Sequence, residues 1–179
     1  MENQLPKTTR NRRRTRNYKD EQVSEEELQK ILEAANKTPS ENDLKPWNFK
    51  VLQDKEIINF ISRKSKEAML KSDNKSMVNI GKSPSNIFYN APTVIIVSGK
   101  EDVSSALSDC SKAVENMLIA SESIKLGAIW VGLVVFFFKL KDEVKKLEVP
   151  SGYKPCYAVA IGYKSRDTIP APLKKLKKI

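Results

Sequence analysis

Helical patterns alternate with short, apolar, β-branched segments along most of this chain. The longest helical pattern covers residues 102–126, and its apolar side chains fall on one broad face. A buried-strand pattern stands on each side of it, at 93–97 and at 128–135. The dipeptides Asn-Gly and Asp-Gly, which are strong hairpin signals, do not occur, so we expect helices to connect the strands. This alternation predicts a three-layer sandwich in which helices cover a central sheet.

Local signals predict the other elements. Ser24 and Glu27 have the spacing of a capping box, which predicts a helix that begins after Ser24 and ends near Asn36. Further elements are expected as a strand over 47–52, a helix after Asp54, a short helix over 142–147 and a last strand over 156–163.

Three segments carry no strong pattern, namely 1–11, 71–90 and 164–179. Residues 1–11 are expected to form a flexible basic leader. Residues 12–179 are expected to form a single domain, with 164–179 as its extended C-terminal arm. The polar segment 71–90 is rich in Ser, Asn and Lys, and we expect it to be a long, partly mobile loop of the kind that forms lids.

Positive charge is concentrated at the two ends of the chain. The net charge of the 179 residues is +10. The segment 1–19 has one acid, Glu2, and seven basic residues, namely Lys7, Arg10, Arg12, Arg13, Arg14, Arg16 and Lys19. The segment 174–179 has four lysines and no acid, so the ends contribute +6 and +4 and the body is neutral. This distribution indicates an anionic partner: a phosphate ligand, a nucleic acid or a membrane surface.

Composition excludes several kinds of chemistry. The absence of histidine excludes Ser-His-Asp and Cys-His catalysis and histidine metal sites. The two cysteines, Cys110 and Cys156, are far apart in the sequence, match no zinc spacing and imply no disulfide framework. The longest nearly apolar run, 126–138, is shorter than the roughly 18–20 residues that span a bilayer. We therefore expect a cytoplasmic protein that does not enter the membrane.

Four segments could bind a ligand, and each has a simpler alternative. The arginines of 12–16 could surround a phosphate, or could form a solvated arm or a nucleic-acid-binding tail. The stiff polar loop 38–47 could recognise a planar heterocycle, or could be a capping and turn segment. Gly132 would allow close approach of a ligand to the backbone, or could mark a bulge in a buried strand. Residues 149–163 could be only a turn followed by a core strand.

Taken together and in this order, the four segments resemble the FMN-dependent nitroreductase family. The arginine segment RRRTRNY at 12–18 is similar to the family's N-terminal motif, and PSENDLKPW at 39–47 is similar to its polar loop. LGAIWVG at 126–132 resembles its glycine-containing segment, and 150–163 resembles its closing Gly-Tyr pattern. Asp109 and Asn116 also stand where the family's long central helix carries similar residues.

The resemblance implies an α+β fold: a three-layer α/β/α sandwich with a mostly antiparallel sheet, assembled as an interlocked homodimer. It implies FMN at the dimer interface, reduced at N5 by hydride from NAD(P)H and reoxidised by a nitroaromatic, quinone or similar acceptor in a ping-pong cycle. No catalytic side chain and no metal are implied, because the flavin carries the chemistry. The implied cofactor-binding residues are Arg12, Arg13, Arg14, Arg16, Pro39, Ser40, Asn42, Asp43, Lys45, Trp130, Val131, Gly132, Lys174 and Lys175.

Two positions depart from the family pattern. Asp43 stands where the family usually has Asn, and Lys45 where it usually has Gln. We expect Lys45 to compensate the charge of Asp43, unless Asn42 takes the amide role after a one-residue shift of the loop. The alternative to an enzyme is a binding protein, either an FMN carrier or a basic nucleic-acid-binding module. The neutral body of the chain, which has no basic face with interleaved aromatic residues, is evidence against the nucleic-acid module.

Overall fold

A four-stranded antiparallel sheet forms the centre of the molecule. The computed structural model describes residues 4–165. The strands are β1 (Trp47–Leu52), β2 (Thr93–Lys100), β3 (Leu126–Trp130) and β4 (Tyr153–Tyr163), and their order across the sheet is β1-β2-β4-β3. All three strand pairs are antiparallel. Helices lie between consecutive strands in the sequence, as the lack of hairpin signals predicted.

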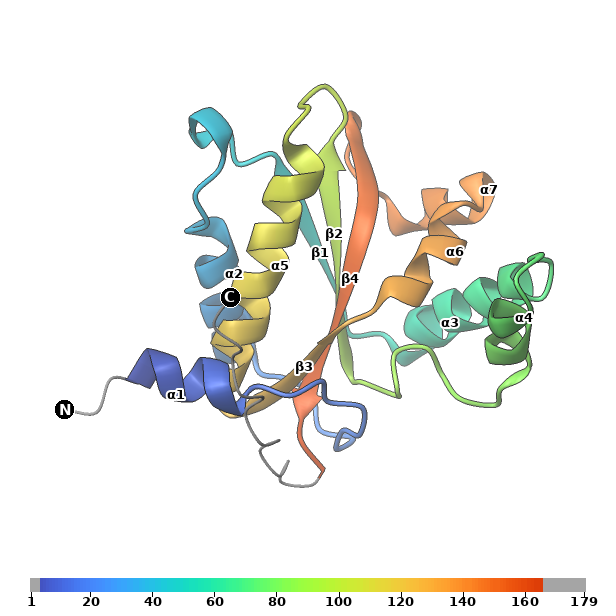
Figure 1. The fold of residues 1–179 in the computed structure, drawn as a ribbon, viewed down its shortest axis with the longest axis horizontal. Coiled ribbons are helices and arrows are strands. Elements are labelled where there is room, and N and C mark those ends of the chain that lie inside the picture. Colours follow the sequence, from blue (N-terminus) through green and yellow to red (C-terminus); the bar gives the residue numbers. More distant parts are fainter. Residues whose placement is uncertain (1–3, 166–179) are drawn as a thin grey trace, which may run out of the picture.

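Helices cover both faces of the sheet (Figure 1). Helix α2 (Glu25–Asn36) and helix α5 (Ala106–Ser123) lie together on one face. The opposite face carries α3 (Lys55–Met69), α4 (Lys75–Lys82), α6 (Val135–Phe138) and α7 (Lys141–Val144). The three-layer arrangement and the antiparallel sheet that we expected are therefore confirmed.

The residues of β2 alternate between two hydrophobic cores. Ile95 and Val97 belong to the core beneath α2 and α5, whereas Val94 and Ile96 belong to the core beneath α3 and α6. All four side chains are completely buried. Burial on both faces explains why this strand is a continuous apolar run rather than an alternating one.

Local signals fixed the start of two helices. Ser24 Oγ accepts a hydrogen bond from the Glu27 backbone N–H, and the Glu27 carboxylate accepts one from the Ser24 N–H, so the predicted capping box is present. Asp54 accepts hydrogen bonds from the N–H groups of Glu56 and Ile57 and so caps α3.

Three secondary-structure expectations were wrong in detail. Helix α1 (Gln4–Asn11) occupies most of the stretch for which we expected an irregular leader, and it lies against α5. Helix α4 lies inside the expected loop 71–90. The strand expected over 128–135 ends at Trp130, where the 3₁₀ helix η2 (Gly132–Val134) and then α6 continue the chain.

The last of these differences also concerns the apolar run 126–138. Because this run is divided among a strand, a 3₁₀ helix and a short α-helix, it does not form a single apolar helix. Among residues 4–165, no helix combines the length and the apolar character that crossing a bilayer requires.

Candidate functional site at the edge of the sheet

The arginine segment runs beside β3, the strand at one edge of the sheet. Arg14 forms an isolated parallel bridge with Ala128, and the Thr15 N–H donates a 3.4 Å hydrogen bond to the Ala128 carbonyl. Thr15 is buried against Gly127, where a Cβ would lie only 2.5 Å from the Thr15 side chain. The absence of a side chain at Gly127 therefore lets the segment approach the sheet edge.

Tyr18 fixes the other end of the segment. Its hydroxyl donates to the carbonyls of Thr15 (2.9 Å) and Ala160 (3.3 Å). Burial raises the pKa of the Tyr18 phenol above its ordinary value, so the hydroxyl remains a donor at neutral pH.

The arginine side chains have different surroundings. Arg12 forms a 2.6 Å ion pair with Glu115 of α5, and its buried Nε has no hydrogen-bond acceptor among the described residues. Arg13 donates to the backbone carbonyls of Arg10 and Arg12. Arg14 and Arg16, on either side of buried Thr15, are exposed. These two guanidinium groups are the ones placed to meet a ligand from outside the protomer.

Trp130, Val131 and Gly132 follow along the same strand edge. The Trp130 ring packs edge-to-face on Tyr157 with 4.6 Å between ring centroids. The Val131 N–H donates to the Ala158 carbonyl at 2.8 Å and is therefore used by the sheet. Gly132 is exposed, and a Cβ placed on it would have no heavy atom of residues 4–165 within 4 Å beyond its chain neighbours. The open position in this trio is thus Gly132.

The polar loop that precedes β1 is tightly turned. Asn42, Asp43 and Lys45 all adopt positive φ values, of 50°, 54° and 45°, around the 3₁₀ helix η1 (Glu41–Asp43). Ser40 Oγ accepts a 2.9 Å hydrogen bond from the Lys45 N–H and so closes the turn. Lys45 Nζ lies 3.7 Å from Asp43 Oδ1, so the two residues that depart from the family pattern form an ion pair.

Two residues of α5 hold the base of this loop. Asn116 Nδ2 donates to Thr38 Oγ1 at 2.7 Å, and Asp109 Oδ2 accepts from the Glu41 N–H at 3.3 Å. Asp109 is only 1% exposed and forms a 2.6 Å ion pair with Lys112. Burial alone would raise the pKa of Asp109, but its hydrogen bonds, above all that from Lys112, hold the pKa below its ordinary value.

We expect Asp109 to make the stability of the chain depend on pH in the acid range. Because its pKa is lower in the folded than in the unfolded chain, its contribution is complete above the ordinary value of 3.8 and is lost as the pH falls through the folded value. Asp109→Asn should lower the free energy of unfolding by about 1–3 kcal/mol at neutral pH and by progressively less in acid. Urea unfolding from neutral pH into the acid range measures both effects.

Asp102→Asn is the matched control for this substitution. Asp102 also pairs with a lysine, Lys100, but its side chain is 72% exposed, so the change should alter stability by less than about 0.5 kcal/mol. An Asp109→Asn variant with the same pH profile as wild type would show that the lowered pKa does not contribute to stability.

The predicted site residues form two groups within one chain. Residues 12–16 and 130–132 lie at the β3 edge, whereas 39–45 leads into β1, the opposite edge of the sheet. In Figure 1 the loop 39–45 lies near the start of α5, and α1 lies near the end of α5. Lys174 and Lys175 lie outside the described residues.

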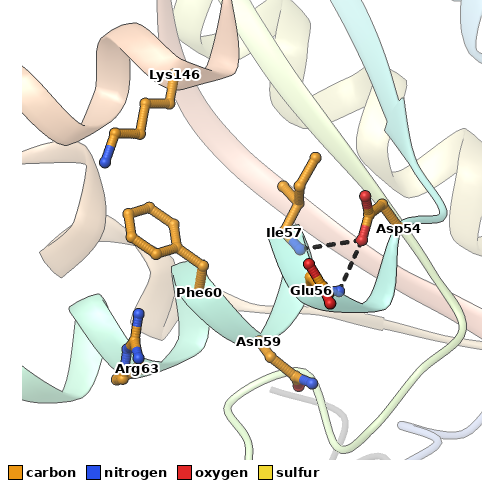
Figure 2. Close-up of a pocket in the computed structure, with 7 residues that line it drawn as sticks. All are labelled: Asp54, Glu56, Ile57, Asn59, Phe60, Arg63 and Lys146. Carbon is orange, nitrogen blue, oxygen red and sulfur yellow. Dashed lines mark hydrogen bonds between the residues drawn. The ribbon is translucent and has the colours of Figure 1, made fainter.

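A separate hollow lies beside the start of α3 (Figure 2). It has a volume of about 720 Å³ and is lined by Asp54, Glu56, Ile57, Asn59, Phe60, Arg63 and Lys146. The Phe60 ring has Lys146 Nζ at 4.5 Å and Arg63 Cζ at 5.7 Å from its centroid. None of the predicted cofactor-binding residues within 4–165 lines this hollow.

Comparison with known proteins identifies the family. The model of the nitroreductase family matches residues 9–163, which include the arginine segment, the polar loop and Gly132. The chain belongs to the nitroreductase family. It is therefore an oxidoreductase, as the sequence motifs implied.

Relatives and solved structures agree with this assignment. A protein of Methanothermobacter thermautotrophicus, provisionally named NADH dehydrogenase/NAD(P)H nitroreductase, is 30% identical over 164 residues, which are 87% of this chain and 75% of that protein. The crystal structure of a nitroreductase with bound FMN from Bacteroides fragilis superimposes with a TM-score of 0.87 at 29% identity, over 98% of this chain and 95% of that one. An FMN-bound nitroreductase from Desulfitobacterium hafniense gives a TM-score of 0.87 at 25% identity over 100% of both chains.

Three residues of this candidate site were not predicted from the sequence. Glu115 pairs with Arg12, Thr15 anchors the arginine segment on Gly127, and Tyr89 lies beneath Arg16 with 5.7 Å from Cζ to the ring centroid. Thr15 lies within the arginine motif, where a small residue between two arginines could have indicated an inward-facing position. Glu115 and Tyr89 are far from the arginines in the sequence and carry no local signal.

Proposed function

We propose that this chain is an FMN-dependent oxidoreductase that takes electrons from NAD(P)H and delivers them to a nitroaromatic, quinone or similar acceptor. Bound FMN would accept hydride at N5 from the reduced nicotinamide and return the electrons to the acceptor in a ping-pong cycle. The protein would bind and orient the cofactor and would exclude water, with no side chain acting as an acid, base or nucleophile.

The observation that carries this proposal is the shared position of the exposed arginines and Gly132 at the β3 edge. Arg14 pairs with Ala128, only four positions before Gly132, so positive charge and an open backbone position occur on the same strand edge. Arginine guanidinium groups form bidentate hydrogen bonds with phosphate oxygens, and a glycine allows a planar ring to approach the backbone closely. The donor set therefore fits a flavin mononucleotide. We propose that Arg12, Arg13, Arg14 and Arg16 bind its phosphate and ribityl end or the pyrimidine edge of its flavin, and that Lys174 and Lys175 also reach the phosphate.

The position of the polar loop supports a site built from two chains. Within one protomer the loop leads into β1, and β2 and β4 lie between β1 and β3. Three strand spacings make the distance between β1 and β3 about 14 Å. A loop at the β1 edge is thus poorly placed for a ring against Gly132 of the same chain. We propose a homodimer with two sites, in which Pro39, Ser40, Asn42, Asp43 and Lys45 of one chain complete the site formed by Trp130, Val131 and Gly132 of the other.

The visible absorbance spectrum of the purified protein tests this function. We expect flavin bands that bleach on anaerobic addition of NADH or NADPH and recover when a quinone or nitroaromatic acceptor is added. A colourless protein that takes up no added FMN would contradict the proposal. Bound flavin that neither nucleotide reduces would favour an FMN carrier or another electron donor.

The charges of the Asp43–Lys45 pair should tune the reduction potential of the bound flavin. A carboxylate near the ring opposes the negative charge that reduction adds, so Asp43→Asn should raise the midpoint potential and Lys45→Gln should lower it. Both side chains are at least half exposed, so each effect should correspond to about 0.2–1 kcal/mol, or roughly 5–20 mV for a two-electron couple.

Dye-equilibrated reduction of the purified flavoprotein measures these shifts. Glu33→Gln, an exposed acid near the end of α2, is the matched control and should leave the potential unchanged. Equal potentials for wild type, Asp43→Asn and Lys45→Gln would place this pair away from the ring.

A further inference from the structure

The fold brings together the only two cysteines of the chain. Cys110 lies on α5 and is completely buried, and Cys156 lies on β4 and is partly buried. Their sulfur atoms approach the carbonyls of adjacent residues of β2: Cys156 Sγ is 3.3 Å from Val97 O, and Cys110 Sγ is 3.7 Å from Ser98 O. Both side chains therefore lie against the same two-residue segment of β2, Val97 and Ser98, and both belong to the same hydrophobic core.

A β-bulge directs Cys156 toward the helix. Val97 pairs with Tyr157 and Ser98 pairs with Pro155, so Cys156 is the extra residue between two successive pairs. Bulges re-aim a side chain relative to a regular strand. Gly99 of β2 leaves room for the Cys110 side chain, because a Cβ at position 99 would lie only 3.3 Å from Cys110 Sγ. Local backbone geometry thus supports the contact between strand and helix.

The two thiols differ in exposure and in acidity. Cys156 lines a surface hollow of about 410 Å³ together with Lys100 and Lys154, whereas Cys110 is closed off from solvent. The neighbouring Cys110 side chain and nearby backbone groups lower the pKa of the Cys156 thiol, whereas the neighbouring Cys156 side chain and burial raise the pKa of the Cys110 thiol. Cys156 is therefore the thiol that ionises first and that a small oxidant can reach.

We propose that Cys156 and Cys110 form a peroxide-sensitive pair that closes an internal disulfide between β4 and α5. The Cys156 thiolate attacks one oxygen of a hydroperoxide, the O–O bond breaks, and a sulfenic acid and water (or an alcohol) are formed. Cys110 then attacks the Cys156 sulfur, the S–S bond forms and a second water leaves. In total the two thiols lose two electrons and two protons, and the peroxide takes up all of them.

Peroxide titration of the wild-type protein tests the pair without reference to flavin or turnover. We expect both thiols to disappear together from a thiol assay of the denatured chain. The intact mass should fall by two hydrogen atoms, the chain should remain uncrosslinked on a non-reducing gel, and dithiothreitol should restore both thiols. Peptide mapping should place the disulfide between Cys110 and Cys156.

Single variants separate the two roles. Cys110→Ala should stop the reaction at a Cys156 sulfenic acid that dimedone traps, and Cys156→Ser should keep Cys110 reduced at the same peroxide dose. Because Cys110 lies in the core, Cys110→Ser serves as a second version should the alanine variant fold poorly. The proposal would be overturned if both thiols of the wild-type protein remained intact at a peroxide dose that oxidises Cys156 in the Cys110→Ala variant. A disulfide between two chains would also overturn it.

Discussion

Replacing Gly132 with valine should weaken FMN binding by about 100-fold, roughly 3 kcal/mol, while leaving the unliganded chain as stable as wild type. Within the described part of the protomer, a Cβ at this position has no heavy atom within 4 Å, so this part of the fold accommodates a side chain. In the proposed site, however, the branched side chain would fill the space that the flavin ring needs. Fluorescence titration with FMN and thermal unfolding of the apoprotein measure the two effects separately.

Gly127→Ala is the matched control, because it adds one methyl group at the other glycine of the segment 126–132. There the new Cβ would lie 2.5 Å from buried Thr15, so this variant should lose about 1–3 kcal/mol of stability. A Gly132→Val protein that binds FMN like wild type would remove the flavin from this position. One that unfolds as early as Gly127→Ala would show that Gly132 serves the fold alone.

The layer arrangement could be predicted because its signals are local. The capping box of Ser24 and Glu27 fixed the start of α2, and the apolar β-branched run 93–97 indicated a strand buried on both faces. Each signal depends on neighbours within a few positions, so it survives in any tertiary context. The missing hairpin dipeptides then determined that helices join the strands.

Elements that depend on distant contacts could not be predicted in this way. Helix α1 lies against α5, a contact that no local pattern records. The strand β3 ends at Trp130 because the chain turns into η2, yet residues 131–135 are as apolar as the strand itself. A continuous apolar run does not distinguish a strand from a short buried helix.

The candidate site shows the same division. Its motifs named the arginines, the polar loop and Gly132, because residue type and order are visible in the sequence. The ion pair of Arg12 with Glu115 and the separation of the loop from Gly132 arise only when the sheet is assembled. These tertiary contacts divide the arginines into two groups. Arg12 and Arg13 are held by other groups of the protein, whereas Arg14 and Arg16 are exposed. A ligand can therefore bind Arg14 and Arg16 without displacing an ion pair of the protein.

This division leads to the second large effect. Arg14→Ala combined with Arg16→Ala should weaken FMN binding by about 100-fold or more, because each removes a charge-assisted contact of about 1.5–3 kcal/mol with a phosphate. Both side chains are exposed, and the described contact that would be lost is that of Arg16 with Tyr89, about 0.5–1 kcal/mol. The apoprotein should therefore unfold close to the wild-type temperature, and the affinity for riboflavin, which lacks the phosphate, should change little.

The combination Arg63→Ala and Lys71→Ala removes two exposed cations from the region of α3 and is the control for net charge. It should change FMN affinity less than about twofold, since charges more than a Debye length from the ligand, about 8 Å at physiological salt, are largely screened. Equal losses in both double variants would indicate that the general positive field of the chain attracts the cofactor. Loss confined to Arg14 and Arg16, for FMN and not for riboflavin, would place the phosphate at the β3 edge, the position that leaves the flavin ring facing Gly132.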